Sequence, residues 1–496
     1  MSTFYQILKS FSRIIQSCVI ILLFFGSRFL NAQNHLGSLS DNYGGLNNLQ
    51  INPASICYQP YKFDVNIIGI EAYINNNNYY TKASNTINLL FGSNLNKLVL
   101  NNSKFEKNSM NKGDLILNAD IKANGYAFGG LTINGPSFLI SINKKQAFSF
   151  SVNYRSAFNI TQLSALTSTM LFEGPSYNKV RNRKYDFTNS KFSFANWIET
   201  GLSYAQVIIN NNKYVHRFGG GLKVLWGLNA GYIYDNGFDG TNTNGRDLIL
   251  NNGGFNYAYS GPFNSKKSVA SDLNELRGIG SSIDLGYIIQ KKSNNNLIAC
   301  PDIFKINEET SNYKWKAGVS ILDLGALNFY NSAFSTSVSN ASLNWQNYDT
   351  IFTQNLYSID STLKSYIGSN LVKSSSNFWM ILPSAVSLQF DYKFNNILFL
   401  NATLLQRITP AKVGSLSRMN TLSLSPRFET KAFSIAFPFS VIEYKDINFG
   451  AAIRYKYLTL GSDRIMETLG LQTIYGANLY LSFKFNILNK SGKSSF

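Results

Sequence analysis

YVHRFGGGLKVLWGLNAGYIY, residues 214–234, alternates between large apolar side chains and small or polar ones over most of its length. Its even positions include large apolar side chains such as Phe218, Leu222 and Trp226, whereas its odd positions include most of the small or polar ones, such as Arg217. Successive side chains of a β-strand point to opposite faces, so this pattern predicts one long strand with two different faces. The segment is about twice as long as the roughly 10 residues that a transmembrane strand requires.

The same alternation recurs along the chain in segments separated by polar turns. It is clearest at 137–155, 198–208, 282–290, 386–394, 448–457 and 478–485. The links between strands fall into a short class near 143–146, 210–213, 395–396 and 429–431, and a long polar class near 157–190, 235–278 and 329–376. Short turns at one rim and long loops at the other are typical of outer-membrane barrels. At about 10 residues per crossing, the chain has room for about 14 strands, within a range of 12 to 16.

Composition separates a membrane barrel from a soluble sandwich. Only 15% of the residues are charged, against roughly 25% in a typical soluble domain, and 14% are aromatic. The polar face of each strand is rich in Gly, Ser and Asn, and aromatic residues gather toward strand ends, as expected at a membrane interface. We therefore predict an all-β protein, a transmembrane antiparallel β-barrel in the outer membrane of a Gram-negative cell. A secreted soluble β-adhesin is the alternative.

The N-terminus has the layout of a secretory signal. Lys9 and Arg13 precede an apolar run over residues 19–25, and Ala32 offers a cleavage point. Because the site is imperfect, a retained N-terminal anchor is the alternative. We predict a signal peptide over residues 1–32, an N-terminal plug or hatch segment over 33–60 and the barrel over 61–496.

A helix-start signal interrupts the strand pattern just before the first strand. Asn52 is a good helix cap, and Pro53 is favoured in the first turn, followed by Ala54. This NPA motif has two interpretations. It is either an ordinary helical turn leading into the first strand, or part of a segment that folds into the barrel as a plug.

Charged residues fall on the face that we predict to line the lumen. The candidates are Arg155, Arg217, Lys223, Asp284, Asp391, Lys393, Arg427, Arg454 and Lys456. They either form cross-strand ion pairs that fill the lumen or make an electropositive pore lining that favours anions. In the second case, Arg217→Glu combined with Lys223→Glu reverses ion selectivity in planar bilayers.

The sequence contains few residues that are suited to catalysis or to binding a metal. His35 and His216 are far apart, as are Cys57 and Cys300, and these four residues do not form a metal-ligand pattern. Whether the two cysteines pair is left open by the sequence. The net charge of +18 comes without a Lys/Arg block, so we do not expect a nucleic-acid partner. We predict neither enzyme activity nor a cofactor.

Four segments resemble a known family. They are NPASI (52–56), SSIDLGYII (281–289), SILDLGALNF (320–329) and NLYLSFKFNI (478–487). Together with the predicted signal peptide, they are similar to a Bacteroidetes branch of the long-chain fatty-acid transporter superfamily of outer-membrane proteins. The resemblance implies 14 strands and an N-terminal hatch inside the barrel. It does not identify ligand-binding residues.

Two functions are compatible with this sequence. The first is an outer-membrane channel or transporter for small or hydrophobic solutes, in contact with membrane lipid. The second, which members of the resembled superfamily also perform, is a non-conducting scaffold or type IX secretion accessory that docks exported proteins. An apolar cavity reaching a gap in the wall favours transport, whereas a sealed lumen with ordered loops favours the scaffold.

Overall fold

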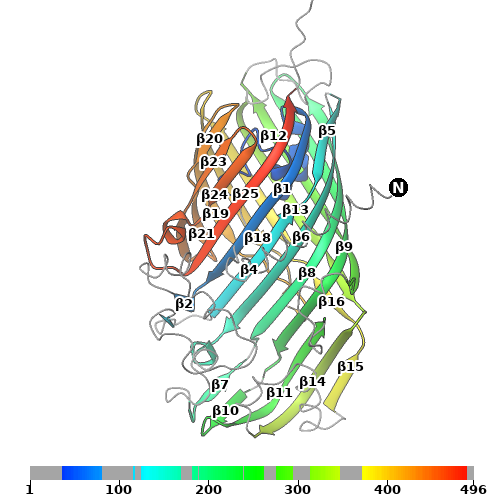
Figure 1. Cartoon of the computed structure of the whole chain (residues 1–496), viewed down its shortest axis with the longest axis vertical. Helices are drawn as coiled ribbons and strands as arrows, with labels where there is room; N and C mark the ends of the chain where they lie inside the picture. The colour runs from blue at the N-terminus through cyan, green and yellow to red at the C-terminus, as the bar shows by residue number, and fades with distance from the viewer. Residues whose placement is uncertain are drawn as a thin grey trace, which may run out of the picture.

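The computed structural model describes residues 36–80, 116–117, 125–143, 145–168, 181–187, 189–237, 239–261, 275–293, 313–346, 371–410 and 412–488. The chain is all-β, and its strands close into a 14-strand antiparallel barrel (Figure 1), which confirms the predicted fold and strand number. The predicted signal peptide lies outside the described residues. Among the described helices, none has the length and apolar character needed to cross a membrane.

The wall of the barrel contains fourteen crossings, some of them built from two consecutive strands. In chain order these are β1 (Tyr61–Asn76), β4 (Gly125–Asn134) with β5 (Ser137–Asn143), β6 (Gln146–Leu163), β8 (Lys191–Asn210), β9 (Tyr214–Asp235), β12 (Gly278–Lys292), β13 (Tyr313–Phe329), β16 (Phe378–Ile381) with β17 (Ala385–Lys393), β18 (Leu398–Arg407), β19 (Thr421–Glu429), β20 (Phe433–Ala436) with β21 (Phe439–Ile442), β22 (Asp446–Phe449) with β23 (Ala451–Tyr455), β24 (Leu458–Ser462) and β25 (Gly476–Leu488). The first strand, β1, pairs with β4 and β5 on one side and with β25 on the other, which closes the barrel.

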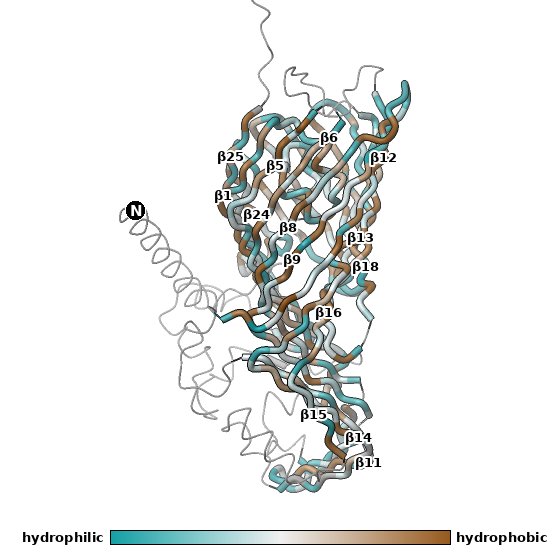
Figure 2. The backbone as a smooth tube through the Cα atoms, turned by 90° about the vertical axis from the view of Figure 1, so that its right-hand side faces the viewer, coloured by the Kyte–Doolittle hydropathy of each residue, from teal (hydrophilic) through white to brown (hydrophobic). Residues whose placement is uncertain are grey.

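Exposed and buried positions alternate along the barrel strands as the sequence predicts. On β9, Leu222 is 65% exposed, whereas Arg217 is 1% exposed. On β25, Leu479, Leu481 and Phe483 are exposed, and apolar and polar positions alternate along the barrel strands in Figure 2. Large apolar side chains that point away from the interior of a closed barrel are suited to contact with lipid.

A β-bulge on β9 breaks this parity. The pairing of β8 with β9 shifts between Asn196 and Trp197, where Trp197 pairs with Gly227 and Asn196 with Asn229. Beyond the shift, Tyr232 is only 8% exposed, although the even-position pattern places it with the outward residues. The bulge therefore turns the last part of β9 around, which a strict period of two does not anticipate.

Additional strands extend the wall beyond the rim that carries the long connections. They are β7 (Lys184–Asp186), β10 (Asp239–Thr243), β11 (Asp247–Ser260), β14 (Ala333–Trp345) and β15 (Val372–Ser375), seen at the bottom of Figure 1. A separate two-stranded sheet pairs β2 (Tyr79–Tyr80) with β3 (Ile116–Leu117). The expectation of long polar loops over 157–190, 235–278 and 329–376 is therefore wrong in part, because all three stretches contain strand residues.

The N-terminal segment, defined here as residues 36–60, lies inside the barrel near the rim with the short turns (blue in Figure 1). It contains two 3-10 helices, η1 (Gly45–Gln50) and η2 (Pro53–Tyr58). Ile56 is fully buried, in a cluster with Leu139 and Ala147 from the hairpin of β5 and β6. One short α-helix, α5 (Ile465–Thr468), lies between β24 and β25.

Candidate functional site

The NPA motif lies against a recess in the barrel wall made by glycines. Gly219 of β9 and Gly286 of β12 are directly paired, so they form a gap without side chains on two neighbouring strands. A Cβ atom on Gly219 would lie 2.6 Å from the Cα of Ala54, and one on Gly286 would lie 2.8 Å from the Cδ of Pro53. Both distances are shorter than real contacts, so only glycine at these positions lets the motif approach this closely.

Asn52 joins this motif to three strands at once. Its side chain accepts a hydrogen bond from the backbone of Ala54 (3.0 Å), which confirms the predicted helix cap. The same side chain donates to the carbonyl oxygens of Tyr287 (3.2 Å) and Val319 (3.3 Å). It also donates to the side-chain oxygen of Gln389 at 2.9 Å. Asn52 therefore caps η2 and fastens it to β12, β13 and β17.

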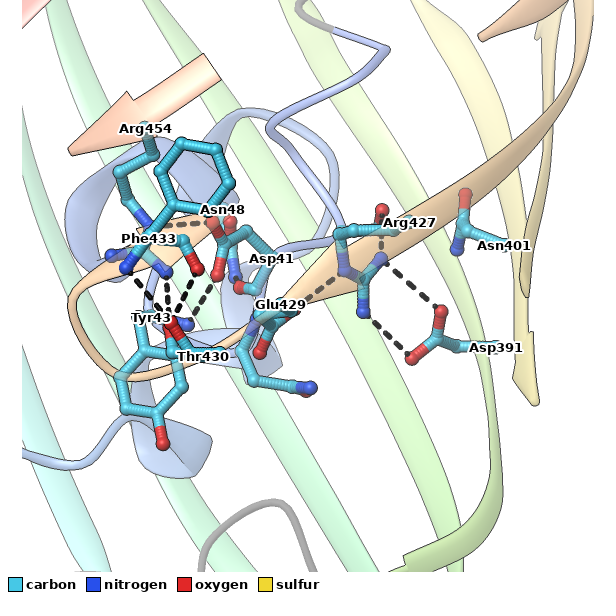
Figure 3. A network of polar contacts seen from close by, with 12 residues as sticks. Asp41, Tyr43, Asn48, Asp391, Asn401, Arg427, Glu429, Thr430, Phe433 and Arg454 are labelled. Carbon is cyan, nitrogen blue, oxygen red and sulfur yellow. Dashed lines mark hydrogen bonds and ion pairs between the residues drawn. The ribbon is translucent and has the colours of Figure 1, made fainter. Parts of the chain in front are cut away.

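An ion-pair network holds the other end of the N-terminal segment (Figure 3). Arg454 of β23 donates from Nε to Asp41 at 2.6 Å. Arg427 of β19 donates to Ser40 at 2.7 Å and pairs with Asp391 of β17 at 3.3 Å. Since these side chains are almost completely buried, each charge depends on its partner rather than on water.

Asp41 is charged in this network. Burial would raise the pKa of its carboxyl group, but the guanidinium groups of Arg454 and Arg427 hold the pKa below its ordinary value. Glu429 accepts a hydrogen bond from the backbone of Asn42 at 3.3 Å, next to this pair. These contacts bind the segment to β19 and β23, which is positioning rather than acid–base chemistry.

A second buried network centres on Asp323 of β13. Its carboxylate pairs with Arg155 of β6 (3.0 Å), Lys223 of β9 (2.8 Å) and Arg418 (2.9 Å). Arg418 belongs to the link between β18 and β19, so the carboxylate of Asp323 joins two other wall strands and a connection. Such a cross-barrel network holds opposite sides of the lumen together.

Positive and negative charges balance in this second network. Glu199 pairs with Arg155 at 3.2 Å, and Asp284 pairs with Lys223 at 2.7 Å. These three cationic and three anionic side chains line a cavity of about 80 Å³, together with a fourth carboxylate, Glu71 of β1, and with Gln50 of the N-terminal segment. The arrangement is closer to the ion-pair interpretation than to an unpaired electropositive lining.

The remaining predicted lumen residues lie outside these two networks. Arg217 is buried and donates to Gln290 at 2.7 Å. Lys393 is half-buried at the end of β17. Lys456 lies in the exposed turn after β23, with its ammonium 5.5 Å from the ring centre of Tyr455, so the structure does not bring it to the lumen network.

Three central residues were not among the sequence candidates. Asp323 has a positive φ of 54° and sits at a shift in the pairing of β12 with β13, so a bulge turns it inward. Arg418 lies in a connection and Asp41 precedes the first strand, where strand parity makes no prediction. The run LDLG (322–325) offered a sequence signal for this bulge. Asp is one of the residues that adopt left-handed backbone most often, and such a residue inside a strand often marks a bulge or turn.

The hydrogen-bonded wall is interrupted on one side, in the half of the barrel that carries the long connections. Within the described residues, β22 pairs only with β21, and β24 ends at Ser462. The chain then runs through the segment 463–475, which contains α5, leads into β25 and is seen beside β21 at the left of Figure 1. Leu469 and Leu471 of this segment are exposed, as is Ile447 of β22. Apolar side chains therefore surround the interruption on its outer surface.

A small cavity lies on the inner side of this interruption. It has a volume of about 20 Å³, and its lining includes Leu36, Tyr73, Met419, Ile442 and Arg464. These residues come from the N-terminal segment, β1, the link between β18 and β19, β21 and the segment 463–475. The interruption, the N-terminal segment and the link thus meet at one place.

Comparison with known proteins gives one family match and distant structural likenesses. The family of unknown function DUF5723 matches residues 53–463. No curated protein matches the chain. Among solved structures, a TodX deltaS2S3 mutant monoaromatic hydrocarbon channel has 10% identity and a TM-score of 0.41, with 93% of this chain and 98% of that chain covered. The Ralstonia pickettii toluene transporter TbuX has 9% identity, a TM-score of 0.38 and coverage of 90% and 94%. A Pseudomonas aeruginosa FadL homologue has 10% identity, a TM-score of 0.36 and coverage of 88% and 92%.

Proposed function

The chain belongs to the DUF5723 family, and from that premise we propose that it is a Gram-negative outer-membrane transporter for small, mainly apolar solutes. The observation that carries the proposal is the interruption between β22 and β25, with an apolar-lined cavity on its inner side and exposed apolar residues on its outer side. A solute that reached this cavity would have a short route through the wall into lipid.

The described state is closed. A volume of about 20 Å³ holds about one water molecule and no organic solute. Passage therefore requires movement of the segment 463–475 or of the link between β18 and β19. In the same proposal, the N-terminal segment is a plug that blocks the rim with the short turns, because its burial and ion pairs keep it inside the barrel.

The proposal is tested by uptake of an apolar dye across the outer membrane of intact cells. N-phenyl-1-naphthylamine becomes fluorescent in lipid, and an intact outer membrane largely excludes it. We expect expression of the protein to accelerate dye entry. Ala477→Leu, at a position that lines the cavity, should slow entry at least fivefold. The matched control is Ala451→Leu, since Ala451 is similarly half-buried but lies on β23. Equal dye entry with and without the protein would contradict the proposal.

The strands beyond the rim favour a second candidate function, the docking of an exported protein. β11, β14 and β15 form an ordered sheet outside the barrel, and within the described residues β15 pairs only with β14. A strand edge of this kind can accept a strand from a partner. Photo-crosslinkers placed on β15 in living cells test this alternative, which predicts a discrete crosslinked product. If no such product forms while dye uptake is observed, the docking function is contradicted and the transporter proposal stands.

A further inference from the structure

The link between β18 and β19 does not stay at the rim but folds into the lumen. We call residues 412–420 the crossing segment. Ser415 and Leu416 are fully buried, and Met419 is 4% exposed. Gly414 has a φ of +66°, and a Cβ there would overlap the carbonyl oxygen of Trp379, so the turn into the barrel requires glycine. A connection that is buried to this degree is part of the interior rather than a surface loop.

Hydrogen bonds attach the crossing segment both to the neighbouring eighth crossing and to strands on the far side of the barrel. The backbone of Leu416 donates to the carbonyl of Ile381 on β16 at 2.9 Å. The backbone of Ser417 donates to Asn159 of β6 at 2.8 Å, and Lys191 of β8 donates to Ser415 at 2.6 Å. Since β6 and β8 are the third and fourth crossings whereas β18 and β19 are the ninth and tenth, the segment spans the lumen.

Apolar contacts hold the segment at two points. Leu416 belongs to a buried cluster with Trp197, Tyr232 and Phe329. Met419 belongs to a different cluster, which includes Tyr73. The two clusters are on different sides of the barrel, so the segment is anchored on both sides of the lumen.

An ion pair fixes the segment between these two apolar contacts. Arg418 donates to Asp323 at 2.9 Å, and no partner within the described residues reaches its Nε atom. Arg418 lines the cavity of about 80 Å³, whereas its neighbour Met419 lines the cavity of about 20 Å³ at the wall interruption. The same short stretch therefore borders both internal cavities.

We propose that the crossing segment closes the lumen a second time, between the N-terminal segment and the rim with the long connections. Arg418 is the residue that holds this closure shut. Rupture of the ion pair with Asp323 frees the segment between Leu416 and Met419 and joins the two cavities. This inference rests on the proposed function in one respect, because the transporter role supplies the solute that the closure admits. It identifies Arg418 as the positioning residue that sets the size of solute able to pass.

The test uses the full-length protein and two separate measurements. The first is the rate at which a maleimide labels a cysteine placed at Leu416, a fully buried position of the crossing segment. In the Leu416→Cys background, we expect Arg418→Ala to accelerate labelling at least tenfold. Lys412→Ala is the matched control, because Lys412 is a cation of the same segment but is exposed, and its removal should leave the rate unchanged. Chains without the new cysteine provide the blank.

The second measurement is dye uptake with the same variants in the wild-type Leu416 background. Faster labelling and faster uptake in Arg418→Ala support both the closure and the transporter. Faster labelling without uptake in any variant supports the closure and contradicts the proposed function. Unchanged labelling in Arg418→Ala overturns the closure, whatever the uptake. Heat-modifiable migration on a gel verifies that each variant contains a folded barrel.

Discussion

Asp41 and Arg454 are 413 positions apart in the chain, yet their side chains are joined by a buried hydrogen bond of 2.6 Å. The contact connects the beginning of the N-terminal segment to one of the last wall strands. Because both groups are nearly inaccessible to water, loss of either leaves a buried charge without its main partner. The attachment of the segment therefore depends on electrostatics at this end and on the fit of the NPA motif to its glycine recess at the other.

Acid should loosen the N-terminal segment. The pKa of Asp41 is lowered in the folded protein relative to the ordinary value of 3.8, so its contribution to stability is complete above about pH 4 and is lost as the pH falls through the folded value. Protection factors for residues 36–60, which correct exchange rates for the intrinsic pH dependence of amide exchange, should fall in that acidic range. Asp41→Asn should show lower protection at neutral pH, with little further change in acid. An acid response in Asp41→Asn equal to that of the wild type would contradict this assignment.

A larger side chain in the glycine recess should expel the NPA motif. Gly219→Val places methyl groups where Ala54 lies, and overpacking of this kind costs about 1–3 kcal/mol. We expect faster hydrogen–deuterium exchange over residues 52–58 and a lower midpoint for heat-modifiable unfolding. Gly220→Val is the matched control, because a Cβ at Gly220 meets its nearest neighbour at an ordinary 3.6 Å. If both variants behave alike, the recess does not hold the motif.

Strand periodicity was enough to predict the barrel but not the details of its interior. Alternation over long segments correctly separated the outward apolar face, as at Leu222, from the buried face, as at Arg217. It failed at bulges, because one extra residue exchanges the two faces beyond it. Tyr232 was placed on the wrong face for this reason, and Asp323 was missed although it centres the second ion-pair network.

The burial of a connection inside the lumen could also not be predicted from the sequence. The crossing segment has no periodic pattern, and its burial depends on partners such as Asn159 and Asp323 that are distant in the chain. The NPA motif was more accessible, because capping by Asn52 is a local interaction between residues two positions apart. The recess that receives the motif was hidden, since it requires the register that pairs Gly219 with Gly286.

The disulfide of Cys57 should tie η2 to a distant part of the chain. Cys57 is disulfide-bonded, and the other cysteines of the sequence are Cys18 and Cys300, both outside the described residues. Because the predicted signal peptide removes Cys18, we expect Cys300 as the partner. Peptide mapping without reductant should recover a linked pair that contains both residues. Alkylation of Cys57 in the unreduced protein would rule out this prediction.

Reversal of a lumen charge should destabilise the barrel before it alters ion selectivity. Lys223 pairs with both Asp284 and Asp323, so Lys223→Glu would place three buried carboxylates together, with Arg155 and Arg418 still bound to Asp323. Breaking a buried pair in this way costs about 3–5 kcal/mol. We expect a marked fall in folded protein, measured by heat-modifiable migration after refolding in detergent.

Two variants separate this effect from charge alone. Lys213→Glu makes the same change in the exposed turn before β9, so it should refold like the wild type. Lys223→Glu combined with Asp284→Lys restores an opposite pair, and it should recover part of the folded yield because the two side chains already lie 2.7 Å apart. A well-folded Lys223→Glu barrel with reversed ion selectivity would instead favour an open charged pore, in which Lys223 faces water rather than its partners.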